Sequence, residues 1–229
     1  MGPITRYNEI KQIRCGEVRL MMQTVLERNK TRHEISNGYA VKKNGAPHGI
    51  RWSVEDYYKM YDLGLFEGRC VELIKGEIFE MSPLLPPHAT SIQLVSEPLR
   101  GVFQKGFEIR EQMPLDFGKY SEPEPDVAVV TGSIRDFSDH HPTNPVLVVE
   151  VSLTTLKFDQ TKKLKLYAEY GIEEYWIVNL KQHQLEVYRG PRNEGDSGTY
   201  DEKIIVTEQG SVSPPGRPNS KLKIRDMLP

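Results

Sequence analysis

The chain has 229 residues, 27% of them charged and 38% hydrophobic, a balance typical of a globular protein with one domain of ordinary size and no second catalytic domain. We find no apolar run of about eighteen residues for a membrane span, no signal-peptide core and no metal-type spacing of the two cysteines, Cys15 and Cys70, so we expect a cytoplasmic protein with no membrane partner. The net charge of −2 is uneven: residues 1–50 hold nine Lys/Arg against four Asp/Glu, and the rest holds 21 against 28. This acidic body argues against a protein that grips DNA over its whole surface, but it allows an enzyme that binds DNA locally.

The N-terminal residues 1–50 show no sustained hydrophobic period and contain turn signals such as Asn37-Gly38. We expect a poorly ordered basic extension there, and the Met21-Met22 pair would serve as an alternative natural start. Residues 51–229 are expected to form a single domain whose core runs from about 68 to 190.

The first elements predicted after this extension are a helix and a hairpin. Ser53 is placed to cap a helix, with Asp56 three residues later as an acidic near-match to a capping box. Two strand-like runs, Val71–Lys75 and Glu77–Met81, flank Gly76 and predict a hairpin with a tight turn.

A second helix and three strands are predicted next. Apolar residues at three- and four-residue steps indicate a helix over His88–Gln104, which Pro98 would kink. Strands are expected over Glu108–Phe117, Asp126–Val130 and Val146–Val151. The last of these is an apolar run interrupted by a single carboxylate, as in a central strand that is buried on both faces.

The C-terminal half alternates helix and strand. A helix over Asp159–Tyr170 should end at Gly171, a favourable C-terminal cap. Strands are expected at Glu174–Asn179 and Leu185–Arg189, and residues 190–199 are rich in Gly, Asn, Asp and Ser, which predicts an exposed loop. Further short strands are expected at Lys203–Thr207 and Leu222–Ile224. The resulting order, α-ββ-α-βββ-α-ββ, predicts an α/β (α+β) fold with a mixed central sheet flanked by helices.

Three features of this pattern indicate chemistry. Asp126 ends a Glu-Pro-Glu-Pro-Asp run, Glu150 lies on the buried strand, and the lysine-rich helix holds Lys162, Lys163 and Lys165. Metal-assisted hydrolysis of a phosphodiester needs hard oxygen ligands for Mg²⁺ and a cation near the attacking water. Because a carboxylate on a two-sided buried strand is costly without a cation or hydrogen bonds, Glu150 is the strongest single indication of a site.

The same features belong to a series of strings along the chain. They are Val71–Ile78, Glu80–Pro83, Ser121–Asp126, Leu147–Ser152, Asp159–Ala168 and Gly171–Val178. In this order they resemble the motifs of the bacterial Uma-type family of restriction endonucleases, formerly a domain of unknown function, over roughly residues 52–190. The resemblance implies the PD-(D/E)xK nuclease superfamily, a restriction-endonuclease-like αβββαβ core with an extra N-terminal hairpin and extra C-terminal strands here. The order of elements predicted from His88 to Asn179 agrees with that core.

The resemblance carries over residue by residue, with one departure. Pro125-Asp126 matches the PD element, and Glu150 matches the acidic residue of the (D/E)xK element. Ser152 stands two residues after Glu150, where the superfamily pattern has lysine. The resemblance implies that this lysine has moved to the following helix, where Lys163 lies four residues after Asp159.

The resemblance also implies roles for these residues. Asp126 and Glu150, with the backbone carbonyl of Val151, would bind Mg²⁺, for which Mn²⁺ is the expected substitute. Lys163 would orient the nucleophilic water and stabilise charge that develops on the phosphate. DNA would be the substrate, and a homodimer is compatible with cleavage of both strands.

Three further residues are candidates for the same site. Glu72 matches an acidic position of the family pattern and would add a fourth catalytic group. His88, at the start of a core helix, and Gln112, on an adjoining strand, are accessory candidates.

Other polar and aromatic residues have plainer interpretations. His88, His140 and His141 show no structural zinc spacing with other Cys or His, which favours loop or surface histidines. Aromatic side chains that could stack on bases are present, but their helical and strand spacing favours core or helix–sheet packing for most of them. They are Tyr167, Tyr170, Tyr175 and Trp176.

Three functions remain open on the sequence alone. The first is a Mg²⁺-dependent DNA endonuclease, and the second is a catalytically inactive nuclease-fold protein that binds nucleic acid or a protein partner. The lysine missing after Glu150 and the acidic body favour the second. The third is a structural or regulatory homo-oligomer, because an exposed hairpin strand such as Leu185–Arg189 would pair between chains.

Overall fold

The structure is a computed structural model that describes residues 49–193, 195 and 197–229. We describe the compact unit Trp52–Pro229. The expectation of a poorly ordered extension concerns residues that lie, apart from 49 and 50, outside the described part of the chain. Within the described residues, no helix is long and apolar enough to cross a membrane.

The unit begins with the predicted helix and hairpin. Helix α2 spans Val54–Asp62, and Ser53 and Asp56 form the reciprocal hydrogen bonds of a capping box at its start. Strands β1 (Val71–Ile74) and β2 (Glu77–Glu80) pair antiparallel through a two-residue turn. In that turn Lys75 and Gly76 both have positive φ, as a tight hairpin turn requires.

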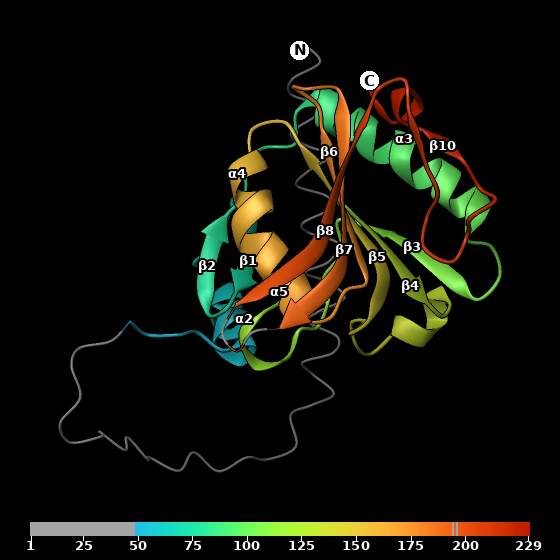
Figure 1. Ribbon diagram of the computed structural model, residues 1–229. Helices are drawn as coiled ribbons and strands as arrows, with labels where there is room; N and C mark the ends of the chain where they lie inside the picture. The colour runs from blue at the N-terminus through green and yellow to red at the C-terminus, as the bar shows by residue number, and fades with distance from the viewer. Residues whose placement is uncertain (1–48, 194, 196) are drawn as a thin grey trace, which may run out of the picture. The chain divides into compact units, whose positions relative to one another are not determined.

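One mixed sheet forms the centre of the described unit (Figure 1). Its strand order is β3-β4-β5-β6-β7-β8, in which β5 and β6 pair in parallel and the other neighbours pair antiparallel. The six strands are β3 (Phe107–Glu111), β4 (Val127–Thr131), β5 (Pro145–Ser152), β6 (Glu174–Asn179), β7 (Gln184–Asn193) and β8 (Gly198–Thr207). This arrangement confirms the predicted mixed sheet flanked by helices.

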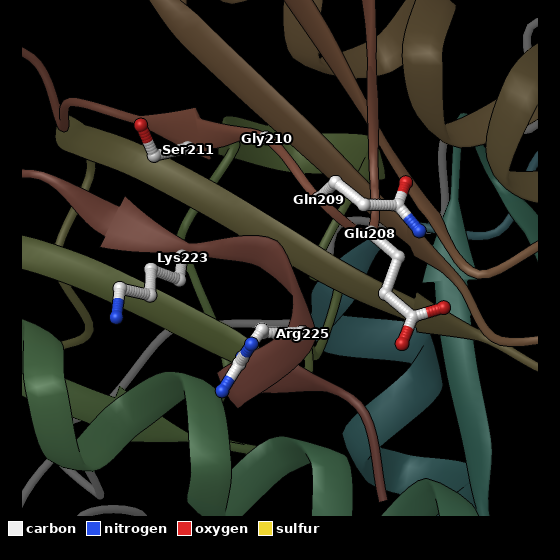
Figure 2. Close-up of a pocket in the computed structure, with 6 residues that line it drawn as sticks. All are labelled: Glu208, Gln209, Gly210, Ser211, Lys223 and Arg225. Atoms are coloured by element: carbon white, nitrogen blue, oxygen red, sulfur yellow. The ribbon is translucent and has the colours of Figure 1, made fainter.

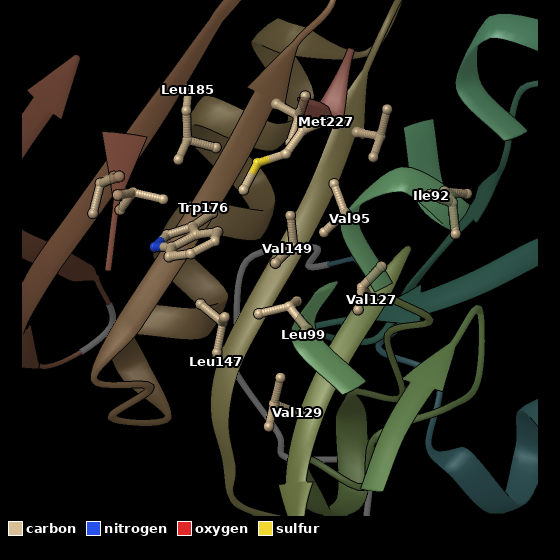
Figure 3. Packing of buried hydrophobic residues seen from close by; sticks show 14 of the residues in the cluster. Ile92, Val95, Leu99, Val127, Val129, Leu147, Val149, Trp176, Leu185 and Met227 are labelled. Atoms are coloured by element: carbon tan, nitrogen blue, oxygen red, sulfur yellow. The ribbon is translucent and has the colours of Figure 1, made fainter. Parts of the chain in front are cut away.

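Helix α3 (Pro86–Val102) covers one face of the sheet. Its Ile92, Val95 and Leu99 are buried against side chains of β4 and β5, such as Val127 and Val149 (Figure 3). Pro98 lies inside the helix as predicted. The C-terminal segments complete this layer and end the chain beside α3. They are β9 (Ser211–Val212), β10 (Leu222–Lys223) and the 3-10 turn Ile224–Met227.

The opposite face is covered by the helical segment that follows β5. It consists of a turn of α4 (Leu156–Phe158), a π-helical turn (Asp159–Lys163) and α5 (Leu164–Glu169), and it ends before Gly171, which has a φ of 71°. Leu166 and Tyr167 pack there against alternate residues of the sheet. The helix therefore begins earlier than predicted, and the π turn was not predicted.

Two predicted boundaries in the sheet are wrong. The strand expected over Glu108–Phe117 ends at Glu111, because Gln112 adopts a φ of 49° and its N–H bonds to the carbonyls of Pro125 and Asp126. The loop expected over 190–199 is mostly strand, since β7 and β8 extend the pairing to Asn193 and Gly198. The loop was predicted from the polar composition of this segment. The outer half of the hairpin is exposed, which explains that composition, but its backbone is hydrogen-bonded as a strand pair.

The expected edge strand is also placed differently. Leu185–Arg189 lies within β7, which pairs with β6 on one side and β8 on the other. Its backbone groups are therefore used inside the sheet, and this strand cannot pair with a second chain. Leu185–Arg189 is therefore not a strand that would pair between chains, and a homo-oligomer stays a prediction.

Candidate active site

Glu150 lies on the central strand β5 with its side chain on the face covered by α5, and the residue is 3% exposed. Its Oε1 accepts hydrogen bonds from the Lys163 ammonium at 2.8 Å and from the Tyr167 hydroxyl at 2.6 Å. Its Oε2 lies 3.4 Å from the backbone nitrogen of Asp126. Burial raises the pKa of the Glu150 carboxyl well above its ordinary range, against the opposing effect of Lys163.

Lys163 is 1% exposed and stands between two carboxylates. Its ammonium bonds to Glu150 and, at 3.2 Å, to Oε1 of Glu72 on β1. Oε2 of Glu72 lies equally close to the ammonium but has no well-aligned hydrogen bond within the described chain. Burial alone would lower the pKa of Lys163, but the two carboxylates outweigh it and raise the pKa, so the lysine is charged.

The charge of this cluster is not balanced by the lysine. One ammonium faces both Glu72 and Glu150, and Asp159 and Asp126 add further negative charge around it. Burial also raises the pKa of Glu72 in spite of Lys163. A second cation, or a proton, is therefore favoured among these carboxylates.

Asp126 precedes β4, at the same end of the sheet as the C-terminal end of β5, and is 7% exposed. Its Oδ2 accepts hydrogen bonds at 2.8 Å from the backbone N–H of Val151 and from Nε2 of His88. Its Oδ1 is 3.4 Å from the amide nitrogen of Gln112. Asp126 is thus held by groups from three separate elements, and His88, about one-fifth exposed, lies on its solvent side.

All seven predicted site residues meet at this end of the sheet. They are Glu72, His88, Gln112, Asp126, Glu150, Val151 and Lys163. The family pattern has a lysine where this chain has Ser152, which lies on the same face of β5 as Glu150. Lys163 reaches that face from the overlying helix and so places an ammonium beside Glu150.

Two further polar residues of the cluster were not predicted. Tyr167, interpreted only as core packing, bonds to Glu150, and its position four residues after Lys163 on a helix was the available signal. Asp159, buried in the π turn, accepts a hydrogen bond from Thr155 at 2.7 Å. The packing interpretation of Tyr167, Tyr175 and Trp176 is otherwise confirmed, because all three rings are buried.

The residues present fit a hard divalent cation held by oxygen atoms. Glu150 Oε2 and Asp126 Oδ1 are the carboxylate oxygens left with the weakest hydrogen bonds. The carbonyl of Val151 points the same way as its N–H, which bonds to Asp126. Within the described residues, no three His, Cys, Asp or Glu side chains are grouped so that they alone would hold a metal ion. A site of two carboxylates, one carbonyl and water is the form expected for Mg²⁺.

A surface hollow lies elsewhere, beside the C-terminal strands (Figure 2). It is lined by Glu208, Gln209, Gly210, Ser211, Lys223 and Arg225. None of these residues belongs to the cluster around Glu150, so we do not assign the hollow to the candidate site.

Comparisons with known proteins identify a family and a shared fold. The model of a family described as "Putative restriction endonuclease", Uma2, matches residues 54–224, about three-quarters of the chain. A solved structure of a "putative nuclease belonging to DUF820" from Anabaena variabilis ATCC 29413 has a TM-score of 0.58 at 15% identity. The likeness covers 76% of this chain and 96% of that one, and at this identity it shows a shared fold alone. No curated protein matches the chain.

Proposed function

Because the chain belongs to the Uma2 family, which is described as "Putative restriction endonuclease", we propose that it is a Mg²⁺-dependent endonuclease that hydrolyses phosphodiester bonds of DNA, with Mn²⁺ as a substitute. One observation carries this proposal. The buried carboxylate of Glu150 shares a cluster with Asp126 and a buried, charged Lys163, and the carboxylates outnumber the ammonium. Such an excess of buried negative charge is costly in a purely structural core.

In this proposal Asp126, Glu150 and the Val151 carbonyl hold the cation. A bound Mg²⁺ would stabilise charge on the phosphate and lower the pKa of a coordinated water. Asp126 is oriented for that role by the N–H of Val151 and by His88. Glu150 is fixed from the opposite side by the helix that carries Lys163.

Lys163 is proposed to contribute charge rather than a proton. Its raised pKa keeps the ammonium protonated, so it cannot act as a general base near neutral pH. It stabilises the ionised form of Glu150 and would stabilise negative charge that develops on the phosphate. His88 and Gln112, on the outer side of Asp126, are placed to donate hydrogen bonds to a phosphate oxygen.

Cleavage of supercoiled plasmid tests the proposal. We expect nicked and linear products with Mg²⁺ or Mn²⁺, none with EDTA, and a loss of at least about 100-fold in rate for Asp126→Ala and Glu150→Ala. Glu174→Gln is the matched control, because Glu174 is a buried carboxylate of the neighbouring strand that pairs with Arg189 outside the cluster. The proposal fails if plasmid, linear DNA and RNA all stay intact, or if Glu150→Ala cuts like the wild type. If the protein cleaves RNA but not DNA, the proposed substrate is wrong and RNA takes its place.

A second candidate function is a nuclease-fold protein that binds nucleic acid or a protein partner without cutting. The burial of Glu150 and Lys163 favours it, because a phosphate must reach a site whose carboxylates and ammonium are 1–7% exposed. The two functions differ in metal binding. A non-catalytic protein would bind no Mn²⁺ that depends on both Asp126 and Glu150.

A further inference from the structure

We propose that Tyr167 is a positioning residue of this site: its hydroxyl fixes the Glu150 carboxylate so that Oε2 is presented toward Asp126 for a bound divalent cation. The inference rests on the proposed function, in which these two carboxylates hold the metal. It assigns Tyr167 a role beyond packing.

The geometry separates the two oxygens of Glu150. The Tyr167 hydroxyl and the Lys163 ammonium donate to the same atom, Oε1, at 2.6 and 2.8 Å. The two donors are four residues apart and so lie on one face of the helical segment. With Oε1 engaged twice, Oε2 is the oxygen turned toward the Asp126 backbone. One helix face thus fixes the rotation of the carboxylate plane.

The hydroxyl is not needed for packing. The Tyr167 ring is fully buried and contacts Phe117 edge-on, with ring centroids 6.1 Å apart, and Tyr175, with centroids 4.9 Å apart. A phenylalanine ring would fill the same space, and a buried hydroxyl is costly unless it is hydrogen-bonded. This hydroxyl donates its hydrogen bond to Glu150.

A neutral donor also suits a metal ligand better than a second cation would. Lys163 already cancels part of the negative charge around Glu150. A second lysine at the position of Tyr167 would cancel more and weaken the attraction for a divalent ion. A tyrosine hydroxyl orients the carboxylate and leaves its charge available, as outer groups around metal ligands commonly do.

Titration of the full chain with Mn²⁺, followed by calorimetry and by the loss of the free Mn²⁺ paramagnetic resonance signal, tests the inference. We expect Tyr167→Phe to raise the dissociation constant for Mn²⁺ about 10-fold, within the range for outer groups of metal sites. Tyr188→Phe is the matched control, because Tyr188 is 5% exposed and its hydroxyl donates at 2.6 Å to a carboxylate of Glu186, outside the cluster. This control should bind Mn²⁺ like the wild type.

The outcomes separate this inference from the proposed function. If Glu150→Ala abolishes binding but Tyr167→Phe binds like the wild type, the role of Tyr167 is wrong and the metal site stands. If Tyr188→Phe weakens binding as much as Tyr167→Phe, the effect is general loosening and the inference is again wrong. If the wild type binds no Mn²⁺, or binds it as tightly as Glu150→Ala does, the proposed function fails and the inference with it.

Discussion

Two buried carboxylates share one ammonium at the centre of this protein. Glu72 comes from the N-terminal hairpin, Glu150 from the central strand and Lys163 from the helix that covers it, so the cluster joins three elements that are far apart in sequence. Buried ion pairs contribute little net stability compared with apolar residues, but removal of one partner leaves a costly buried charge. The cluster is therefore sensitive to loss of the lysine.

We expect Lys163→Met to lower the free energy of unfolding by about 3 to 5 kcal/mol, because both carboxylates lose their cation. Urea denaturation at neutral pH measures the change. Lys165→Met, an exposed lysine two residues away, is the control and should change stability by about 0.5 kcal/mol or less. Equal effects of the two substitutions would show that Lys163 is not the cation of a buried cluster.

A pH dependence is expected from Glu122, which is buried beside the hairpin and accepts a hydrogen bond from Tyr58 at 2.5 Å. Burial raises its pKa from 4.5 to about 7. The folded state then binds a proton that the unfolded state has lost, so stability falls as the pH rises from the unfolded pKa toward 7. Glutamine has no ionisable carboxyl, so Glu122→Gln removes this loss of stability at high pH.

We therefore compare the free energy of unfolding of Glu122→Gln with that of the wild type. This difference should shift in favour of the variant by about 2 to 3 kcal/mol when the pH is raised from about 5 to about 8. Urea denaturation at both pH values measures this gain. The exposed substitution Glu67→Gln controls for the removal of one carboxylate. A difference between Glu122→Gln and the wild type that is the same at both pH values would contradict the assignment.

Single residues of the site differ in how far the sequence could predict them. Glu150 was predictable because an isolated carboxylate in an apolar strand run has a cost that demands a partner. Lys163 needed the family pattern, since a lysine on an amphipathic helix is usually solvated. The spacing of four residues between Lys163 and Tyr167 places both side chains on one helix face, but their shared partner Glu150 depends on how that helix rotates over the sheet.

Among the elements, the prediction succeeded where the hydrophobic pattern is clear, as in α3 and β6, or where a capping box marks the start of a helix, as in α2. It failed at the π turn, because an extra residue in one helical turn leaves no mark in a 3.6-residue period. The prediction also failed at the outer part of the β7–β8 hairpin. There, polar residues continue the strand pairing, and β8 contacts α5, which the local sequence does not indicate. The π turn carries Asp159 and Lys163, so this error lies within the site.

Gly198, the first residue of β8, shows how closely strand and helix approach. A Cβ at this position would overlap the backbone carbonyl of Lys165 and the backbone nitrogen of Glu169 in the helix of the site. We expect Gly198→Ala to destabilise the protein by about 1 to 3 kcal/mol, because the strand or helix backbone must move. Thermal or urea denaturation measures the loss.

The control for this substitution is Gly101→Ala in α3, where an added Cβ would meet no atom within 4 Å. Alanine has the higher helix propensity, so this variant should be more stable than the wild type by up to about 1 kcal/mol. If Gly198→Ala were as stable as Gly101→Ala, the close contact of β8 with the helix would be wrong.

At the scale of the whole molecule, the sheet brings groups from both of its faces to one end. Glu150 and Lys163 lie under the helix on one face, and His88 comes from the start of α3 on the other. Asp126 stands between them at the start of β4. The resemblance to the nuclease family predicted this meeting, and the predicted order of elements agreed with it.

The charge of the whole chain bears on how DNA would be bound. The residues after position 50 have an excess of seven acidic side chains, and those before it an excess of five basic ones. An acidic body with a local cation site favours few phosphate contacts, so the enzyme would depend on its metal more than on a basic surface. The proposed activity therefore depends above all on the metal site.

A crystal structure of the protein soaked with Mn²⁺ tests this metal site through the anomalous signal of the ion. We expect one strong peak between the carboxylates of Asp126 and Glu150, with the Val151 carbonyl as a further ligand, and no such peak in Glu150→Ala. An anomalous map of the wild type without a peak there, or with Mn²⁺ bound only elsewhere, would contradict it.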